Sequence, residues 1–252
     1  GGVTMGKVML VTGGARGIGR ATALMAAERG WDVAIGWQRD DDAGAEVLAA
    51  IRALGRRAFG LRGDVAQEAD VIALFDAAER ELGRIDSVIV NAGMLARTMP
   101  LAEMTAERMR RTIDVNVMGA LLTAREAARR LGRPMDQPSA SIVLVSSAAA
   151  RLGSPNEFVD YAASKGALDS LNIGLSKELA PKNIRVNAIR PGLIETEIHA
   201  LGGIPDRAQR LASAVPLGRP GSAEEVAEVI LWLAGEQSSY VTGTNVEVTG
   251  GR

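Results

Sequence analysis

The apolar residues of this chain alternate between short runs rich in β-branched side chains and longer amphipathic stretches. This alternation is typical of βαβ units, in which each helix returns the chain to a parallel sheet. Several runs are apolar throughout, which indicates strands covered on both faces. We therefore predict an α/β fold of the Rossmann-type, doubly wound kind, a seven-stranded parallel sheet with helices on both faces. The predicted strands are residues 8–12, 32–37, 58–62, 87–90, 141–146, 185–189 and 245–248.

Two of the stretches between strands carry clear helix signals. Residues 41–54 place apolar side chains at helical spacing, and Gly55 follows as a stop. Ser222 and Glu225 stand at the spacing of a capping box, ahead of another apolar stretch. These signals predict helices that begin and end close to those residues.

The length and composition of the chain favour one domain, residues 1–252. With 252 residues, 47% of them hydrophobic, the chain can bury one sizeable core. The stretches at residues 132–138 and 202–220 carry proline and glycine, and their length indicates loops rather than linkers between domains.

Charge and cysteine content exclude several functions. The formal net charge of −1 gives no basic footprint for nucleic acid or for an anionic membrane, and no apolar run reaches the roughly 20 residues that span a bilayer. The chain has no cysteine, which excludes disulfides and thiolate metal sites and fits a cytoplasmic protein. His199 is the only histidine, and no cluster has zinc-ligand spacing, so we expect no metal and no Ser-His-Asp set.

A glycine-rich segment at residues 12–19, the glycine turn, follows the first predicted strand and precedes a helical pattern at residues 20–29. Gly13 permits a tight turn, while Gly17 and Gly19 allow the backbone to approach a pyrophosphate at a helix N-terminus. The spacing is Gly-x3-Gly-x-Gly, which differs from the commoner Gly-x-Gly-x2-Gly fingerprint. Taken alone, this segment is either a dinucleotide cradle or a simple tight turn.

Further short motifs follow at the ends of the later strands and in two helical stretches. Together with the glycine turn, and in this order, they resemble the short-chain dehydrogenase/reductase family over nearly the whole chain. The resemblance is strongest to bacterial oxidoreductases similar to glucose 1-dehydrogenase and 3-oxoacyl-carrier-protein reductase. The motifs are Asp64-Val65, Asn91-Ala92-Gly93, Asn116, Ser146-Ser147, Tyr161-x3-Lys165, Pro191-Gly192 with Ile194 and Thr196, and the closing strand and glycine pair at residues 245–251.

The resemblance implies a nicotinamide cofactor held along the carboxyl ends of the strands. In the family, residues like Asp64 and Val65 hold the adenine, and a segment like residues 191–196 holds the nicotinamide carboxamide. The candidate cofactor-binding residues are Gly13, Arg16, Gly17, Ile18, Gly19, Arg39, Asp64, Val65, Asn91, Ala92, Gly93, Tyr161, Lys165, Pro191, Gly192, Ile194 and Thr196.

Tyr161 and Lys165 are spaced to lie on one face of a helix. A free phenol titrates at about pH 10, and a neighbouring ammonium favours the phenolate, so the pair suits proton transfer. The plain alternative is a half-exposed aromatic ring beside a solvated lysine. The resemblance makes Tyr161 the general acid and base.

Ser147 and Asn116 complete the candidate catalytic set. By resemblance, Ser147 rather than Ser146 bonds the substrate oxygen, although this chain has one extra residue within residues 148–160. Asparagine is a poor helix former, so Asn116 inside a helical stretch needs a reason. It is either a solvent-facing or back-bonded side chain, or, as in the family, the residue that distorts the helix and holds a water of a proton relay.

The cofactor preference depends on the end of the second strand. An NAD site places an acid there, but Trp37 occupies this position and no carboxylate appears before Asp40. Arg16 and Arg39 are suited to a 2′-phosphate, although both can equally be solvated, and residues 40–42 add negative charge. We expect NADP(H) to be preferred over NAD(H).

The predicted function is hydride transfer between NAD(P)(H) and a small carbonyl or alcohol substrate. The alternatives are a non-catalytic dinucleotide-binding regulator, and an epimerase or dehydratase with tightly bound NAD. By analogy we also expect a homotetramer that pairs through helices at residues 104–131 and 161–180 and through the C-terminal strand region. A substrate loop at about residues 195–220 is expected, with a mobile lid at residues 195–214.

Overall fold

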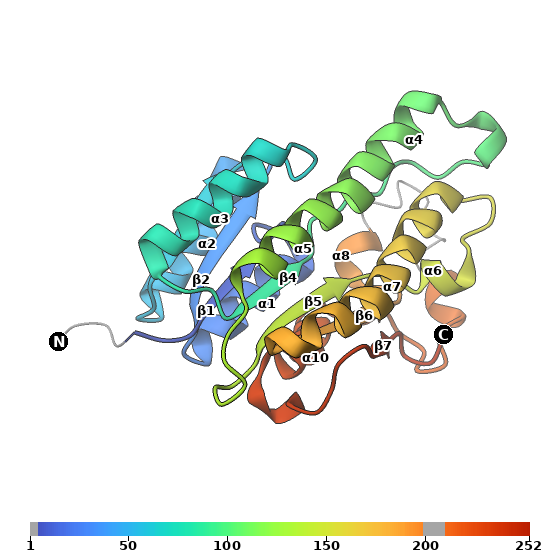
Figure 1. Ribbon diagram of the computed structural model, residues 1–252. Coiled ribbons are helices and arrows are strands. Elements are labelled where there is room, and N and C mark those ends of the chain that lie inside the picture. Colours follow the sequence, from blue (N-terminus) through green and yellow to red (C-terminus); the bar gives the residue numbers. More distant parts are fainter. Residues whose placement is uncertain (1–4, 199–209) are drawn as a thin grey trace.

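The computed structural model describes residues 5–198 and 210–252 of the chain. Its centre is a seven-stranded sheet with the order β3-β2-β1-β4-β5-β6-β7, and every neighbouring pair is parallel (Figure 1). The order reverses between β1 and β4, which is where doubly wound sheets bind their ligands. The strands are β1 Val8–Val11, β2 Asp32–Trp37, β3 Ala58–Arg62, β4 Ser87–Val90, β5 Ala140–Val145, β6 Ile184–Pro191 and β7 Asn245–Val248.

Four strands have the predicted bounds, and three differ at their ends. β1 stops at Val11, because Thr12 already belongs to the glycine turn. β5 begins and ends one residue earlier than predicted, since Ala140 pairs with Ile184. β6 continues to Pro191, which pairs with Val248 of β7 and needs no N–H of its own at the end of the strand.

Helices cover both faces of the sheet because successive strand residues point to opposite sides and both sides are apolar. Val8 and Leu10 of β1 belong to the apolar core under α3, α5 and α7, whereas Met9 and Val11 belong to the core under α1, α2 and α10. The helices are α1 Gly17–Glu28, α2 Asp41–Ala53, α3 Glu68–Leu82, α4 Ala106–Ile113, α5 Gly119–Arg130, α6 Ala149–Leu152, α7 Val159–Leu179, α8 Glu195–Ile198 and α10 Ala223–Ala234.

The helix signals of the sequence are confirmed. α2 ends at Ala53 with Leu54 as its cap, one residue before the predicted end, and Gly55 follows with a φ of 80°. Ser222 caps α10, and Glu225 bonds back to its backbone, so both bonds of the capping box are present.

Part of the segment predicted as a loop at residues 202–220 is helical. Residues 210–213 form a helical turn, and this stretch contains neither glycine nor proline to stop it. His199 and residues 199–209 of the expected lid lie outside the described residues. In the described part of the chain, no helix is long and apolar enough to cross a membrane.

Candidate active site

A cleft of about 640 Å³ lies at the carboxyl ends of β1 to β4, beside the point where the strand order reverses. Eleven of the residues predicted to bind a cofactor line it. These are Gly13, Arg16, Gly17, Ile18, Arg39, Asp64, Val65, Asn91, Ala92, Gly93 and Thr196.

The glycine turn forms the floor of this cleft. Gly13 and Gly17 have positive φ angles, 63° and 54°, which glycine adopts without steric cost. A Cβ on Gly19 would lie 2.1 Å from the backbone oxygen of Gly13, so only glycine fits there. The first turn of α1 begins at Gly17 and presents its free N–H groups to the cleft, which fits a pyrophosphate.

The Asn91-Ala92-Gly93 turn is fastened to the glycine turn. The side-chain amide of Asn91 donates to the backbone oxygens of Thr12 and Gly13, both at 3.1 Å. The hydroxyl of Thr12 accepts the backbone N–H groups of Asn91 and Ala92, both at 3.0 Å. The two motifs therefore form one rigid unit across the reversal point.

Asp64 has a partner that the sequence did not suggest. Its carboxylate accepts the backbone N–H of Ala66 at 2.9 Å and pairs with Arg111 of α4 at 3.0 Å. Val65 packs against α5, where a Cβ on Gly119 would lie 2.7 Å from its side chain. These contacts fix the wall of the cleft that the family resemblance assigns to the adenine.

Charged residues surround the end of β2. Asp40 pairs with Arg16, and the pKa of its carboxyl is lowered by the backbone N–H of Ala43 and then by Arg16. Asp41 accepts the indole N–H of Trp37. Within the acidic run at residues 40–42, Asp40 thus has an arginine partner, and Asp41 has the Trp37 indole and Arg62 as partners.

Arg39 differs from its neighbours. Arg62 also reaches this end of the cleft, where it pairs with Asp41 at 3.1 Å. Arg39 is exposed and lines the cleft, and it makes no ion pair or hydrogen bond with any residue that the structure describes. It is therefore the arginine with a guanidinium available to a bound anion.

Tyr161 and Lys165 lie one turn apart on α7, as predicted. Lys165 is buried, its Nζ donates to the backbone oxygen of Val145 at 2.9 Å, and it lies 5.6 Å from the centroid of the Tyr161 ring. Tyr161 is half-buried and packs edge-on against Phe158 at 5.5 Å. The alternative of a solvated lysine is wrong.

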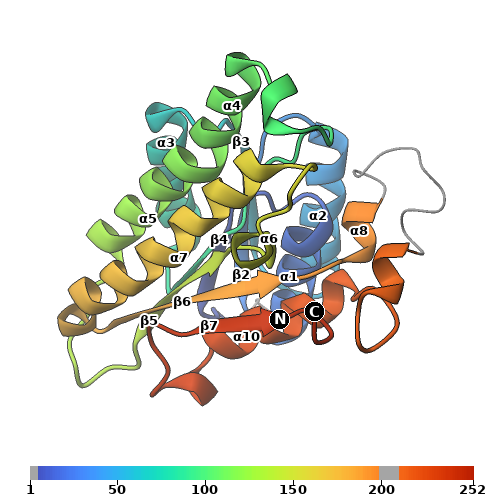
Figure 2. The same ribbon diagram turned by 90° about the vertical axis from the view of Figure 1, so that its right-hand side faces the viewer.

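Asn116 lies in a π-helical segment, Asp114–Met118, between α4 and α5. The three segments form one continuous helix beside α7 (Figure 2). Asn116 is 1% exposed, so it does not face solvent. Its side chain bonds the backbone N–H and oxygen of Met94 at 2.8 and 3.0 Å and the hydroxyl of Ser164 at 3.1 Å. No motif in the sequence singled out Ser164.

Gly93 is the point where the cleft meets two of the candidate catalytic residues. A Cβ placed there would lie 3.3 Å from Oδ1 of Asn116 and 3.4 Å from Nζ of Lys165. The backbone of Gly93, the side-chain amide of Asn116 and the ammonium of Lys165 thus lie close together at the inner end of the cleft. A larger residue at this position would separate them.

The two serines after β5 have different environments. Ser146 is buried, and its Oγ lies 2.7 Å from Oδ1 of Asp169. Ser147 is half-buried, and its Oγ accepts the backbone N–H of Ala149 at 3.1 Å. Only Ser147 combines partial exposure with a hydroxyl proton that no described hydrogen bond uses, which supports its choice over Ser146.

The segment after β6 reaches the glycine turn. A Cβ on Gly17 would lie 3.7 Å from the hydroxyl of Thr196. Ile194 is 1% exposed and belongs to the apolar core, so its side chain is directed away from the cleft. Pro191 accepts the backbone N–H of Ala148 at 2.9 Å, which joins this segment to the residue after Ser147.

Comparisons with known proteins agree with this geometry. A family model described as enoyl-(acyl carrier protein) reductase matches residues 13–252. The uncharacterized oxidoreductase YgfF of Escherichia coli is 46% identical over 97% of this chain and 99% of its own length. The L-rhamnose 1-dehydrogenase (NAD(P)(+)) of a Sphingomonas species is 36% identical over 98% of this chain and 96% of its own. A short-chain dehydrogenase/reductase from Serratia marcescens superposes with a TM-score of 0.90 at 30% identity and covers 99% of this chain and 98% of its own.

Proposed function

Because this chain belongs to the short-chain dehydrogenase/reductase family and is a nicotinamide-dependent oxidoreductase acting on alcohol or carbonyl groups, we propose that Tyr161 is its general acid and base. The named relatives are dehydrogenases and oxidoreductases, which gives no support to the alternatives of a regulator or an epimerase. The observation that carries the assignment is the meeting of Asn116 and Lys165 at Gly93, one helical turn from Tyr161.

The cleft fits the cofactor because its glycine turn leaves no room for a Cβ at the proposed pyrophosphate site. The bound nicotinamide supplies or accepts the hydride. Asp64 and Val65 would hold the adenine, and Asn91, Ala92 and Gly93 would lie beneath the ribose. At the other end, Lys165 would bond the nicotinamide ribose, while residues 191–196 would hold the carboxamide through backbone atoms of Pro191, Gly192 and Ile194 and the hydroxyl of Thr196.

The protein's own residues handle the proton. In the direction of carbonyl reduction, the Tyr161 hydroxyl donates its proton to the substrate oxygen, which the Ser147 hydroxyl polarises through a hydrogen bond. The buried Lys165 ammonium stabilises the phenolate left behind. Asn116 holds the loop at Met94 beside this pair and orders the path by which a proton returns from solvent.

An activity screen tests this assignment. Purified protein is supplied with NADPH or NADH and a panel of ketones, sugars and acyl thioesters, and cofactor oxidation is followed. We expect turnover of at least one carbonyl, and a loss of roughly 100- to 1,000-fold in Ser147→Ala, because one donor to the substrate oxygen is removed. Cofactor fluorescence changes without any turnover would instead identify a protein that only binds.

We further propose that NADP(H) is preferred over NAD(H). Arg39 has no partner in the described part of the chain and lines the cleft beside Trp37, where an NAD site would carry an acid. Arg16 lies at the same end but is paired with Asp40. A guanidinium–phosphate contact contributes on the order of 1.5–3 kcal/mol, so Arg39→Ala should weaken NADPH about 10- to 100-fold and leave NADH unchanged. Equal loss of both cofactors, or an NADH affinity that matches that of NADPH in the wild type, would contradict this preference.

A homotetramer remains a proposal by analogy with the family. Exposed apolar side chains on the helices that we expect to pair support it, among them Met118, Leu121 and Ile173. Light scattering at micromolar concentration tests it, and a monomeric mass would contradict it. A single domain and a cytoplasmic location stay predictions from the sequence.

A further inference from the structure

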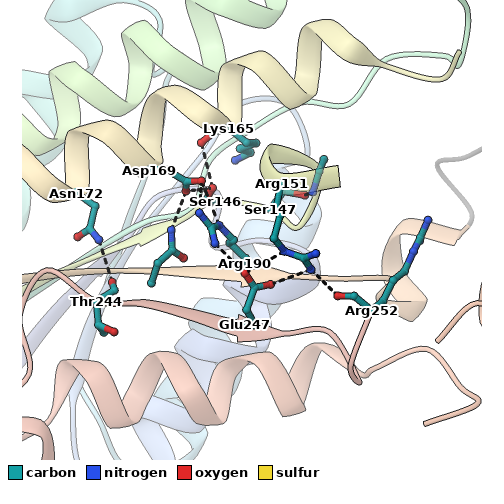
Figure 3. A network of polar contacts seen from close by, with 12 residues as sticks. Ser146, Ser147, Arg151, Lys165, Asp169, Asn172, Arg190, Thr244, Glu247 and Arg252 are labelled. Carbon is teal, nitrogen blue, oxygen red and sulfur yellow. Dashed lines mark hydrogen bonds and ion pairs between the residues drawn. The ribbon is translucent and has the colours of Figure 1, made fainter. Parts of the chain in front are cut away.

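A network of polar side chains lies behind the catalytic residues, between α7 and the ends of β5, β6 and β7 (Figure 3). At its centre is Asp169 of α7, one turn beyond Lys165. One carboxylate oxygen of Asp169 accepts the hydroxyl of Ser146 at 2.7 Å and the side-chain amide of Asn245 at 2.9 Å. The other accepts Nη2 and Nε of Arg190 at 2.8 and 3.1 Å.

Ser146 connects this carboxylate to both catalytic elements. It directly precedes Ser147, and its Oγ also lies 3.1 Å from the backbone oxygen of Lys165. On the other side of the same turn, Nζ of Lys165 donates to the backbone oxygen of Val145. The strand end and the helix turn are therefore joined at two points, one through the lysine side chain and one through Ser146.

From this arrangement we propose that Asp169 is a positioning residue, which holds Ser147 and Lys165 in a fixed position relative to each other through the hydroxyl of Ser146. A serine hydroxyl has one proton, and a carboxylate binds it more strongly than a neutral carbonyl does. Asp169 therefore fixes the rotation of that hydroxyl. Arg190 balances the charge of the carboxylate, whose side chain is only 16% exposed.

The network also reaches the far side of Ser147. Arg190 bonds Glu247 of β7 at 2.8 Å, and Glu247 pairs with Arg151 of α6 at 3.4 Å. α6 begins at Ala149, the residue whose N–H bonds the hydroxyl of Ser147. The proposed substrate-facing serine is thus bracketed by the Asp169 contact before it and by the Arg151 contact after it, as Figure 3 shows.

Another buried carboxylate provides a matched control for a purely structural role. Glu126 of α5 is 4% exposed and is held by Arg125, Arg129 and Arg130. Arg130 continues from it to Asp76 and Glu79 on α3, away from the catalytic strand end. Both carboxylates are paired with arginine, but of the two only Asp169 bonds a neighbour of the proposed catalytic serine.

The test is a double-mutant cycle of Asp169→Asn and Ser146→Ala, with Glu126→Gln as control. We expect each single variant to lower kcat by roughly 10- to 100-fold at saturating substrate, because the catalytic groups shift relative to each other. The NADPH dissociation constant should stay within about twofold, and the double variant should be no slower than the slower single one. Glu126→Gln should lower Tm by about as much as Asp169→Asn does, while keeping kcat within about twofold.

Several results would overturn the proposal. A kcat in Asp169→Asn within twofold of wild type would do so, as would single effects that multiply in the double variant, or an equal loss of kcat in Glu126→Gln. If Asp169→Asn does not fold, Ser146→Ala decides alone, since it removes one oxygen, and an unchanged kcat then overturns the proposal. The inference rests on the roles proposed for Ser147 and Lys165. If those proposed roles are wrong, activity will survive in Ser147→Ala. The double-mutant cycle, by contrast, reports only the coupling of Asp169 to Ser146.

Discussion

The two ends of the cleft are built from the same kind of ion pair in opposite surroundings. At the end proposed to bind adenosine, the side chains of Arg16 and Asp40 are 74% and 35% exposed, and Arg39 is free among the described residues. At the proposed catalytic end, Arg108 and Asp160 are 10% and 6% exposed, and Asp160 immediately precedes the proposed catalytic tyrosine. The Arg16–Asp40 pair is thus largely solvent-exposed, whereas the Arg108–Asp160 pair is buried.

This difference in exposure indicates different roles for the two ion pairs, one in the choice of cofactor and one in fixing geometry. Exposed pairs are weak, screened by salt and easily exchanged for a ligand, so they suit the choice between cofactors. A buried pair cannot lose a partner without leaving an uncompensated charge, so it fixes geometry. Arg108 does this directly, since its guanidinium bonds Asp160 at 3.1 and 3.3 Å and also the backbone oxygen of Arg97 in the loop after β4. We expect changes at the adenosine end to alter affinity, and changes at the catalytic end to alter stability and turnover.

The largest expected effect on stability comes from Asp160→Asn. This change leaves the guanidinium of Arg108 buried without a countercharge, which should lower the free energy of unfolding by about 3–5 kcal/mol. Urea denaturation followed by circular dichroism measures it. The matched control is Asp40→Asn, which breaks an arginine pair in water and keeps a good helix cap, so its denaturation midpoint should stay at the wild-type value. Equal midpoints for the two variants would remove the contrast between the two ends.

A third carboxylate, far from the cleft, separates burial from catalysis. Burial opposes ionisation of Asp32, but the backbone N–H groups of Gly6 and Arg57 and the guanidinium groups of Arg57 and Arg56 lower its pKa below the ordinary 3.8. A lowered folded pKa contributes stability above pH 3.8 that is lost as the pH falls through the folded pKa. Urea midpoints between pH 5 and pH 2.5 should therefore fall more steeply in wild type than in Asp32→Asn, with kcat at neutral pH unchanged in the variant. Parallel curves would contradict this account of Asp32.

The smallest expected effect concerns cofactor choice. Asp40→Asn releases Arg16 from its ion pair, so NADPH should bind about two- to fivefold more tightly relative to NADH, the size of a surface pair. Asp42→Asn is the control, because it removes the same charge from the same helix turn without touching Arg16. Fluorescence titration of both cofactors measures the ratio. The same gain in both variants would mean that general charge, and not the release of Arg16, sets the preference.

The same contrast explains what the sequence alone can predict. The bounds of β2, β3, β4 and β7 follow from apolar runs, and Tyr161 and Lys165 follow from helical spacing, since both are local patterns. The glycine turn is local too. These features need no knowledge of how distant segments pack.

The contacts that position the site are not local. Arg111 is 47 residues from Asp64, Arg108 is 52 residues from Asp160, and Arg190 is 21 residues from Asp169. Whether such residues meet depends on the rotation of each helix over the sheet, which a pattern of apolar residues fixes only to one face. In a chain with 29 lysines and arginines and 30 acids, many other pairings would satisfy the sequence equally well.

We propose that Tyr161 transfers the proton while the rest of the cleft holds the cofactor. The direct measurement is single-turnover oxidation of bound NADPH by a saturating reactive ketone, in wild type and in Tyr161→Phe, together with the NADPH dissociation constant of each. Loss of one hydroxyl should lower the rate by roughly 100- to 10,000-fold and leave the dissociation constant nearly unchanged. A Tyr161→Phe protein that binds NADPH normally and oxidises it at close to the wild-type rate would rule out Tyr161 as the proton donor.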